Sequence, residues 1–162
     1  MMITRSARFS RCGTYRYELL RRWDEGSGCC VFIGLNPSTA DAGMDDPTVR
    51  RCMGFARDWG FQQLKLVNLF AYRTPYPREL HRCANPAGSA NRRAIRRACH
   101  RADKVVAAWG VHGSLHDQAQ KLADIWVELS LECFGLTQSG QPVHPLYQRR
   151  DAALQPFRNS LV

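Results

Sequence analysis

Long apolar runs are missing from this 162-residue sequence. The longest, around residues 29–35 and 105–111, are far too short to span a bilayer, so we expect no membrane partner. No apolar signal-peptide core follows the first six residues, which predicts a cytoplasmic protein. The seven cysteines have no metal-type spacing. Five of them lie within or beside apolar patterns and are expected to be reduced and to pack in the core: Cys29, Cys30, Cys52, Cys99 and Cys133. We predict no metal site and no cofactor.

Lysine is also scarce, because it occurs only at positions 65, 104 and 121. Arginine therefore dominates the excess of 23 Lys+Arg over 14 Asp+Glu, which gives a formal charge of +9. The guanidinium group suits forked contacts with phosphate, so this balance predicts attraction to polyanions without indicating specificity. Hydrophobic residues make up 44% and charged residues 23%, which is ordinary for a globular protein. We expect one monomeric domain over 1–162.

Short apolar runs alternate with helical periodicity along the chain. Strands are predicted at 29–35, 64–69, 105–109 and 127–134, and helices at 47–59, 89–102 and 115–126. Asp46 before Pro47 is typical of a helix N-terminus, and Gly60 of its end. The pattern predicts an α/β fold, a three-layer α/β/α sandwich with a mainly parallel four-stranded sheet. Residues 1–28 are predicted to add an N-terminal strand or hairpin.

The loops that follow parallel strands gather at one edge of the sheet, where ligands bind in such folds. This topology predicts that Asn36, Asn68, Gly110 and His144 meet at one crevice. Gly34 lets backbone approach a ligand closely, and Pro37 stiffens the loop. The long 71–88 loop, with three prolines, is typical of a functional or mobile segment.

Each polar candidate has a structural alternative. The Asn36 amide can hold a water, or it can belong to a plain turn after a core strand. His144 can donate a hydrogen bond to an atom that gains negative charge, or it can be a surface histidine before a rigid turn. Asn68 can contact the edge of a base or fasten a turn. His112 is a secondary candidate in the loop after strand 105–109.

Charged and aromatic residues supply further candidates. Asp41, Asp45 and Asp46 can ligate Mg²⁺ or act as a base, although Asp46 is more simply a helix cap. Phe70 and Tyr72 can stack on a base or belong to the core and its rim. Five arginines share one face of the predicted 89–102 helix and can hold phosphates or remain solvated: Arg92, Arg93, Arg96, Arg97 and Arg101.

Five motifs in order resemble a bacterial and phage family of unknown function: Gly-Leu-Asn-Pro-Ser-Thr-Ala-Asp, Asp-Asp-Pro-Thr-Val-Arg-Arg-Cys, Asn-Leu-Phe-Ala, Ala-Ala-Trp-Gly and His-Pro-Leu-Tyr. This resemblance covers residues 10–148. Gly34–Pro37 and His144–Pro145 are more distantly similar to two motifs of the uracil-DNA glycosylase superfamily, especially its mismatch-specific branch. Ser38 stands where that superfamily usually has glycine, and Leu146-Tyr147 replace a serine and its neighbour.

The superfamily resemblance implies that Asn36 positions the attacking water and His144 stabilises the departing base. It implies Leu146 near the position of a wedge, and a base pocket closed by Asn68-Leu69-Phe70 followed by Arg73-Thr74. The substrate-binding residues are then Gly34, Leu35, Pro37, Ser38, Asn68, Phe70, Gly110, Pro145 and Leu146, and the nucleic-acid backbone residues are Arg73, Arg92, Arg96 and Arg97.

The expected function is hydrolysis of the N-glycosidic bond of a uracil-like, mismatched or modified base. The expected partner is single- or double-stranded DNA, or a nucleoside or nucleotide. A non-catalytic nucleic-acid or nucleotide binding module on the same fold is the main alternative. A metal-dependent hydrolase that uses Asp41, Asp45 and Asp46 is the third.

Overall fold

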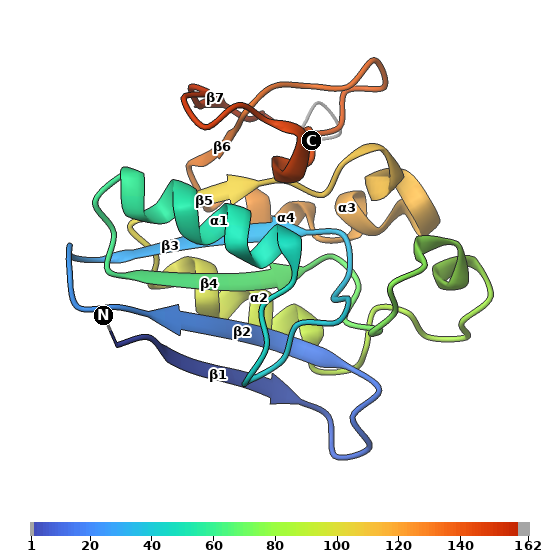
Figure 1. Ribbon diagram of the computed structural model, residues 1–162. Coiled ribbons are helices and arrows are strands. Elements are labelled where there is room, and N and C mark those ends of the chain that lie inside the picture. The colour runs from blue at the N-terminus through green and yellow to red at the C-terminus, as the bar shows by residue number, and fades with distance from the viewer. Residues whose placement is uncertain (1, 159–162) are drawn as a thin grey trace.

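A single mixed sheet forms the centre of the computed structural model, which describes residues 2–158 (Figure 1). The predicted 1–162 domain thus extends past the described residues at both ends. The order of the seven strands is β1-β2-β4-β3-β5-β6-β7. Their bounds are Thr4–Phe9 (β1), Arg16–Arg22 (β2), Cys29–Gly34 (β3), Gln63–Asn68 (β4), Lys104–Ala107 (β5), Leu131–Cys133 (β6) and Gln155–Pro156 (β7).

Four central strands run parallel, with β3 between β4 and β5, and β6 beyond β5. The predicted strands at 29–35, 64–69 and 105–109 are confirmed, whereas the one at 127–134 shrinks to the three residues of β6. The predicted count of four strands is wrong, because β1, β2 and β7 extend the sheet by antiparallel pairing at its two sides. Apolar β3 is buried on both faces, as a central parallel strand must be.

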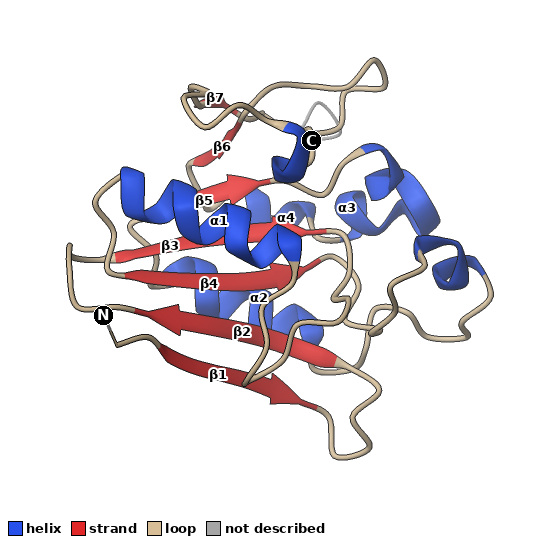
Figure 2. Cartoon of the chain, viewed as in Figure 1, coloured by secondary structure: helices blue, strands red, loops and turns tan. Residues whose placement is uncertain are grey.

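Helices lie on both faces of this sheet (Figures 1 and 2). Helix α1, Pro47–Asp58, packs Val49, Cys52 and Phe55 into one apolar cluster, together with Phe32 of β3. Helix α2, Asn91–His100, packs Ile95 and Ala98 into a second cluster on the other face. Both predicted helices are therefore confirmed, although each is shorter than expected.

The predicted 115–126 helix is wrong. Its place is taken by a 3₁₀ segment, η2 (Val111–Asp117), and two single-turn helices, α3 (Gln118–Lys121) and α4 (Ala123–Trp126). The positive φ of His116 and Asp117, 54° at both, prevents one continuous helix. Two further 3₁₀ turns are η1 (Pro77–His81), inside the predicted 71–88 loop, and η3 (Pro145–Tyr147). No helix among residues 2–158 is both long and apolar enough to cross a membrane.

Strands β1 and β2 form the predicted N-terminal hairpin, which contains a β-bulge. Arg8 pairs with Glu18, but the next residue, Phe9, pairs with Arg16, so Tyr17 is the extra residue. A bulge of this kind turns the residues beyond it to the opposite face of a strand. It therefore determines the face on which the Arg16 side chain lies.

Candidate functional site

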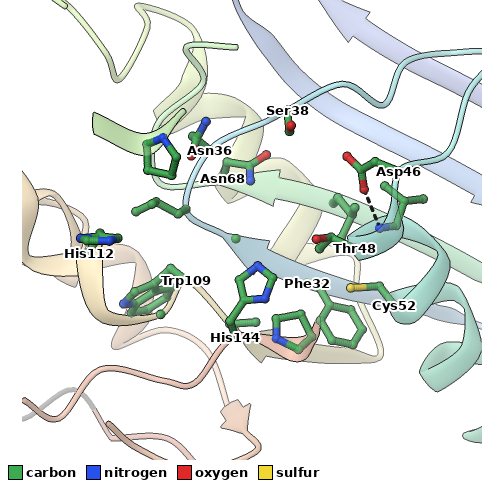
Figure 3. Close-up of a pocket in the computed structure, with 18 of the residues that line it drawn as sticks. Phe32, Asn36, Ser38, Asp46, Thr48, Cys52, Asn68, Trp109, His112 and His144 are labelled. Carbon is green, nitrogen blue, oxygen red and sulfur yellow. Dashed lines mark hydrogen bonds between the residues drawn. The ribbon is translucent and has the colours of Figure 1, made fainter. Parts of the chain in front are cut away.

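A cavity of about 390 Å³ opens at the carboxyl ends of β3, β4 and β5, on the α1 side (Figure 3). Asn36 follows β3, Asn68 ends β4, Gly110 follows β5, and His144 precedes η3. All four line this cavity, as the parallel topology predicts. Residues that are more than a hundred positions apart in the sequence therefore share one site.

Asn36 presents only one end of its amide to the cavity. Its Nδ2 donates to the main-chain carbonyl of Thr74 (2.8 Å) and to that of Pro37 (3.0 Å). Both amide hydrogens are thus engaged within the surrounding loops, and Thr74 N donates to Pro37 O, which ties the two loops together. No described protein group donates to Oδ1, so this oxygen can accept a hydrogen bond from a water or ligand.

Asn68 shows the opposite arrangement. Arg16 Nη2 lies 3.5 Å from Asn68 Oδ1, and a guanidinium group can only donate, so Nδ2 is the atom that faces the cavity. A Cβ added at Gly34 would lie 2.8 Å from that Nδ2. Gly34 therefore leaves the space that the Asn68 amide occupies. The site needs glycine here for close packing against Asn68, whereas the predicted approach of a ligand to Gly34 stays a prediction.

His144 lies across the cavity from these two amides (Figure 3). Leu146 N–H donates to His144 Nδ1 at 3.1 Å, so Nδ1 is unprotonated and the neutral ring carries its proton on Nε2. Burial lowers the pKa of His144 below its usual 6.5, and the nearby Asp46 charge opposes this shift only in part. A neutral imidazole with an Nε2–H donor therefore faces the cavity at pH 7.

Arg16 is a lining residue that the sequence analysis missed. Its side chain is only 3% exposed, donates to Ala40 O at 3.0 Å, and leaves its Nε without a partner among the described residues. Burial lowers the pKa of Arg16 to about 10, so the group remains charged at pH 7. The bulge at Tyr17 brings this charge under the cavity. No local signal indicates it, because an arginine at the start of a strand is normally exposed.

The walls between these polar groups are largely apolar. Phe32, Leu66 and Cys52 form one side, and Trp109, whose indole N–H donates to Gln141 Oε1 (2.7 Å), lies on another. Tyr147 lies at the rim and is 83% exposed. Apolar walls with a few oriented polar groups are typical of sites for small ring-shaped ligands.

The predicted substrate-binding residues are only partly brought together. Those that line the cavity are Gly34, Leu35, Ser38, Asn68, Gly110 and Pro145. Phe70 is fully buried in the core against α2, so its predicted stacking on a base is wrong. Pro37 contributes only its carbonyl oxygen to the loop, and Leu146 does not line the cavity. Tyr147, not Leu146, is the exposed side chain after His-Pro, and exposed His112 also lines the cavity.

The three carboxylates of the 41–46 loop have structural partners. Asp46 caps α1 by accepting from Val49 N–H at 2.9 Å, and Asp41 accepts from Gly43 and Met44 N–H, which lowers its pKa. Burial opposes ionisation of Asp45, yet hydrogen bonds from Arg21 (2.7 Å) and Arg5 lower its pKa. This arrangement favours a loop-holding role over metal ligation.

The arginines that were predicted to contact a nucleic-acid backbone do not surround the cavity. Arg92 and Arg96 on α2 pair with Asp124, on the face of the sheet opposite α1. Arg97 shares that helix. Arg73 donates to the carbonyl oxygens of Ser38 (3.1 Å) and Thr39 (3.2 Å), so it holds the loop after β3.

The chain belongs to the family described as a protein of unknown function (DUF1643), whose model matches residues 16–146. The predicted membership of a family of unknown function is thereby confirmed. No curated protein and no solved structure matches the chain. The similarity to the uracil-DNA glycosylase superfamily stays a prediction that depends on the two short motifs.

Proposed function

We propose that this DUF1643 protein hydrolyses the N-glycosidic bond of a nucleobase held in the cavity, on a fold related to the three-layer sandwich of uracil-DNA glycosylases. One observation carries the proposal. The free oxygen of Asn36, the free amide N–H of Asn68 and the Nε2–H of neutral His144 face one largely apolar cavity. An acceptor and two donors then surround a single flat ligand.

The reaction is dissociative in this proposal. The bond between C1′ and the base nitrogen breaks, and its electron pair leaves with the base. Asn36 Oδ1 accepts a hydrogen bond from the water that adds to C1′, and the proton of that water passes to solvent. The products are a free base and a hydroxyl at C1′. Asn36 acts by position, because an amide does not take up a proton at neutral pH.

His144 supports the departure of the base. Its Nε2–H donates to an oxygen of the base on which negative charge develops. A preorganised donor of this kind contributes about 3 kcal/mol to the stability of a transition state. Because burial keeps the imidazole neutral, no proton has to leave His144 before the base binds.

Asn68 and Arg16 favour a base with a carbonyl group. Arg16 holds Asn68 Oδ1, so the Asn68 amide offers a donor and not an acceptor to the ligand. A carbonyl oxygen can accept from it, whereas an exocyclic amino group leaves the donor unpaired. A buried donor without a partner costs about 1–3 kcal/mol, which selects against amino-bearing bases.

A release assay tests the proposal. The protein is incubated with oligonucleotides that contain uracil, a mismatch or a bulky modified base, and alkali-sensitive abasic sites are counted. Asn36→Ala and His144→Ala are compared with His100→Ala, an exposed histidine on α2. We expect base release to fall about a hundredfold in His144→Ala and to be unchanged in His100→Ala. Melting curves identify variants that fail to fold.

The outcomes separate enzyme from binding module. Base release that survives both Asn36→Ala and His144→Ala refutes the assigned roles. If no substrate releases a base but free uracil binds and Asn68→Ala abolishes that binding, the cavity is a non-catalytic base-binding site. The oriented polar groups of the cavity are the only observation that favours this second function, non-catalytic binding of a base.

A further inference from the structure

Two further hollows along α1 share Arg150 and form a groove that has no lining residue in common with the cavity. The cavity itself is lined by Thr48, Val49 and Cys52 of α1, and by Tyr147. The next hollow, of about 220 Å³, is lined by the following turns of α1 and by the segment after η3, through Arg50, Arg51, Gly54, Phe55 and Arg150. A third hollow shares Arg150 and reaches Arg149 and Asp58 at the end of α1. Figure 1 shows this red C-terminal segment beside α1.

Arginines dominate the walls of the groove. Four arginines and two carboxylates line the two hollows: Arg50, Arg51, Arg149, Arg150, Asp58 and Asp151. The Arg50 guanidinium donates to the carbonyl oxygen of Asp45 (3.0 Å), and that of Arg51 donates to the carbonyl oxygen of Gln148. Arg149 and Arg150 are more than four-fifths exposed, and their ion pairs with Asp151 (3.1 Å) and Asp58 (2.9 Å) lie in solvent. Such surface pairs contribute little to stability, so phosphate groups can replace the carboxylates at small cost.

Gly54 forms an open part of the groove floor. A glycine inside a helix destabilises it relative to alanine, yet a Cβ at Gly54 would meet no atom within 4 Å. Packing within the described protein therefore does not require glycine at this position. Gly54 lines the hollow together with Arg51 and Arg150, and the space above it can hold a small side chain.

We propose that this groove, lined by Arg50, Arg51, Gly54 and Arg150, binds the sugar-phosphate backbone of a polynucleotide strand. The inference rests on the proposed function only in that a base of the same strand enters the cavity. Tyr147 lines the cavity, is 83% exposed and precedes Arg150 by three residues, so in this proposal it stacks on a base between the cavity and the groove. The substrate is then a nucleic-acid strand and not a free nucleoside, and its path follows α1 and not the arginine face of α2.

Binding of fluorescent single-stranded oligo(dT) to the full chain tests the path. Arg149→Gln/Arg150→Gln is compared with Arg93→Gln/Arg97→Gln on α2, which removes the same charge from residues that have no ion-pair partner in the described part of the chain. We expect the groove variant to lose about tenfold in affinity and its salt slope to shrink by about 1.4, because two phosphate contacts are lost. The α2 variant is expected to bind almost as the wild type does.

Two substitutions at Gly54 test the floor. Gly54→Glu places a carboxylate in the groove. It is expected to weaken oligo(dT) binding at least as much as Arg149→Gln/Arg150→Gln does. Gly54→Ala is expected to bind normally and to melt at a higher temperature. Thymidine binding in the cavity is expected to be the same in all of these variants.

Several results would overturn the inference. An equal loss in both double variants shows attraction by net charge alone, and a larger loss in the α2 variant puts the strand on the other face. Absence of oligo(dT) binding by the wild type at low salt also overturns it. If the groove variants lose binding but no base is ever released, only the proposed hydrolysis fails.

Discussion

Replacing Asp46 tests whether the acidic loop is structural. Its carboxylate is only 9% exposed, accepts from Val49 N–H at 2.9 Å and from Ala40 N–H at 3.4 Å, and lies near the buried charge of Arg16. Loss of an N-cap costs about 1 kcal/mol. Leaving Ala40 N–H and Arg16 without that partner adds about 1–2 kcal/mol. We therefore expect Asp46→Ala to lower the free energy of unfolding by about 2–3 kcal/mol.

Asp46→Asn separates the cap from the charge. The asparagine side-chain oxygen still accepts from Val49 N–H, so we expect a loss of about 1 kcal/mol. Urea unfolding at pH 7, with and without a chelator, measures both variants, and exposed Asp151→Asn serves as the control. If Asp46→Ala is within ~0.5 kcal/mol of the wild type, the capping argument is refuted. If the chelator destabilises the wild type by as much as the substitution does, the carboxylate is a metal ligand instead.

Three further predictions concern the cavity and one exposed thiol. Gly34→Ala is expected to displace the Asn68 amide, because the new Cβ would lie 2.8 Å from its Nδ2, and to cost about 1–3 kcal/mol in urea unfolding; an unmoved Asn68 in a crystal structure would contradict this. For His144, ¹⁵N NMR is expected to show an unprotonated Nδ1 and a pKa below 6.5. Burial lowers this pKa in the folded state, so the contribution of neutral His144 to the free energy of unfolding is fully present above pH 6.5 and declines as the pH falls through the folded pKa. A measured pKa at or above 6.5 would refute the burial argument. Hydrogen bonds between the Cys12 thiol group and the side chains of Ser10 and Thr14 lower the pKa of Cys12 to about 7. Mass spectrometry is therefore expected to find Cys12 alkylated first at pH 7.5, and earlier labelling of any other cysteine would count against it.

The parts of the site that follow from topology could be predicted without coordinates. The apolar runs of β3, β4 and β5 are interrupted by helical patterns, and parallel strands place their carboxyl ends at one edge. Asn36, Asn68 and His144 therefore had to approach the same crevice. The Asp46-Pro47 start of α1 was equally local, because capping depends on neighbouring residues alone.

Other features depend on contacts between distant segments, which cannot be predicted from any short stretch of the sequence. Phe70 follows Asn68 closely in sequence but points into the core, and the segment 111–126 breaks where His116 adopts a positive φ. Arg92 and its neighbours lie away from the cavity because α2 covers the face of the sheet opposite α1. Each of these outcomes is set by packing between elements that are distant in the chain.

The sequence by itself determined the central parallel strands, the two main helices and the edge at which polar residues collect, because hydrophobic periodicity, capping and strand direction act over short distances. Only the tertiary structure decided the orientation of each polar group in the cavity. The bulge at Tyr17 turns Arg16 inward, and Arg16 then orients the Asn68 side-chain amide. The side-chain amide of Asn36 is oriented by its hydrogen bond to the carbonyl oxygen of Thr74. The register between strands and the docking of distant loops create these contacts, and neither is encoded in any one segment.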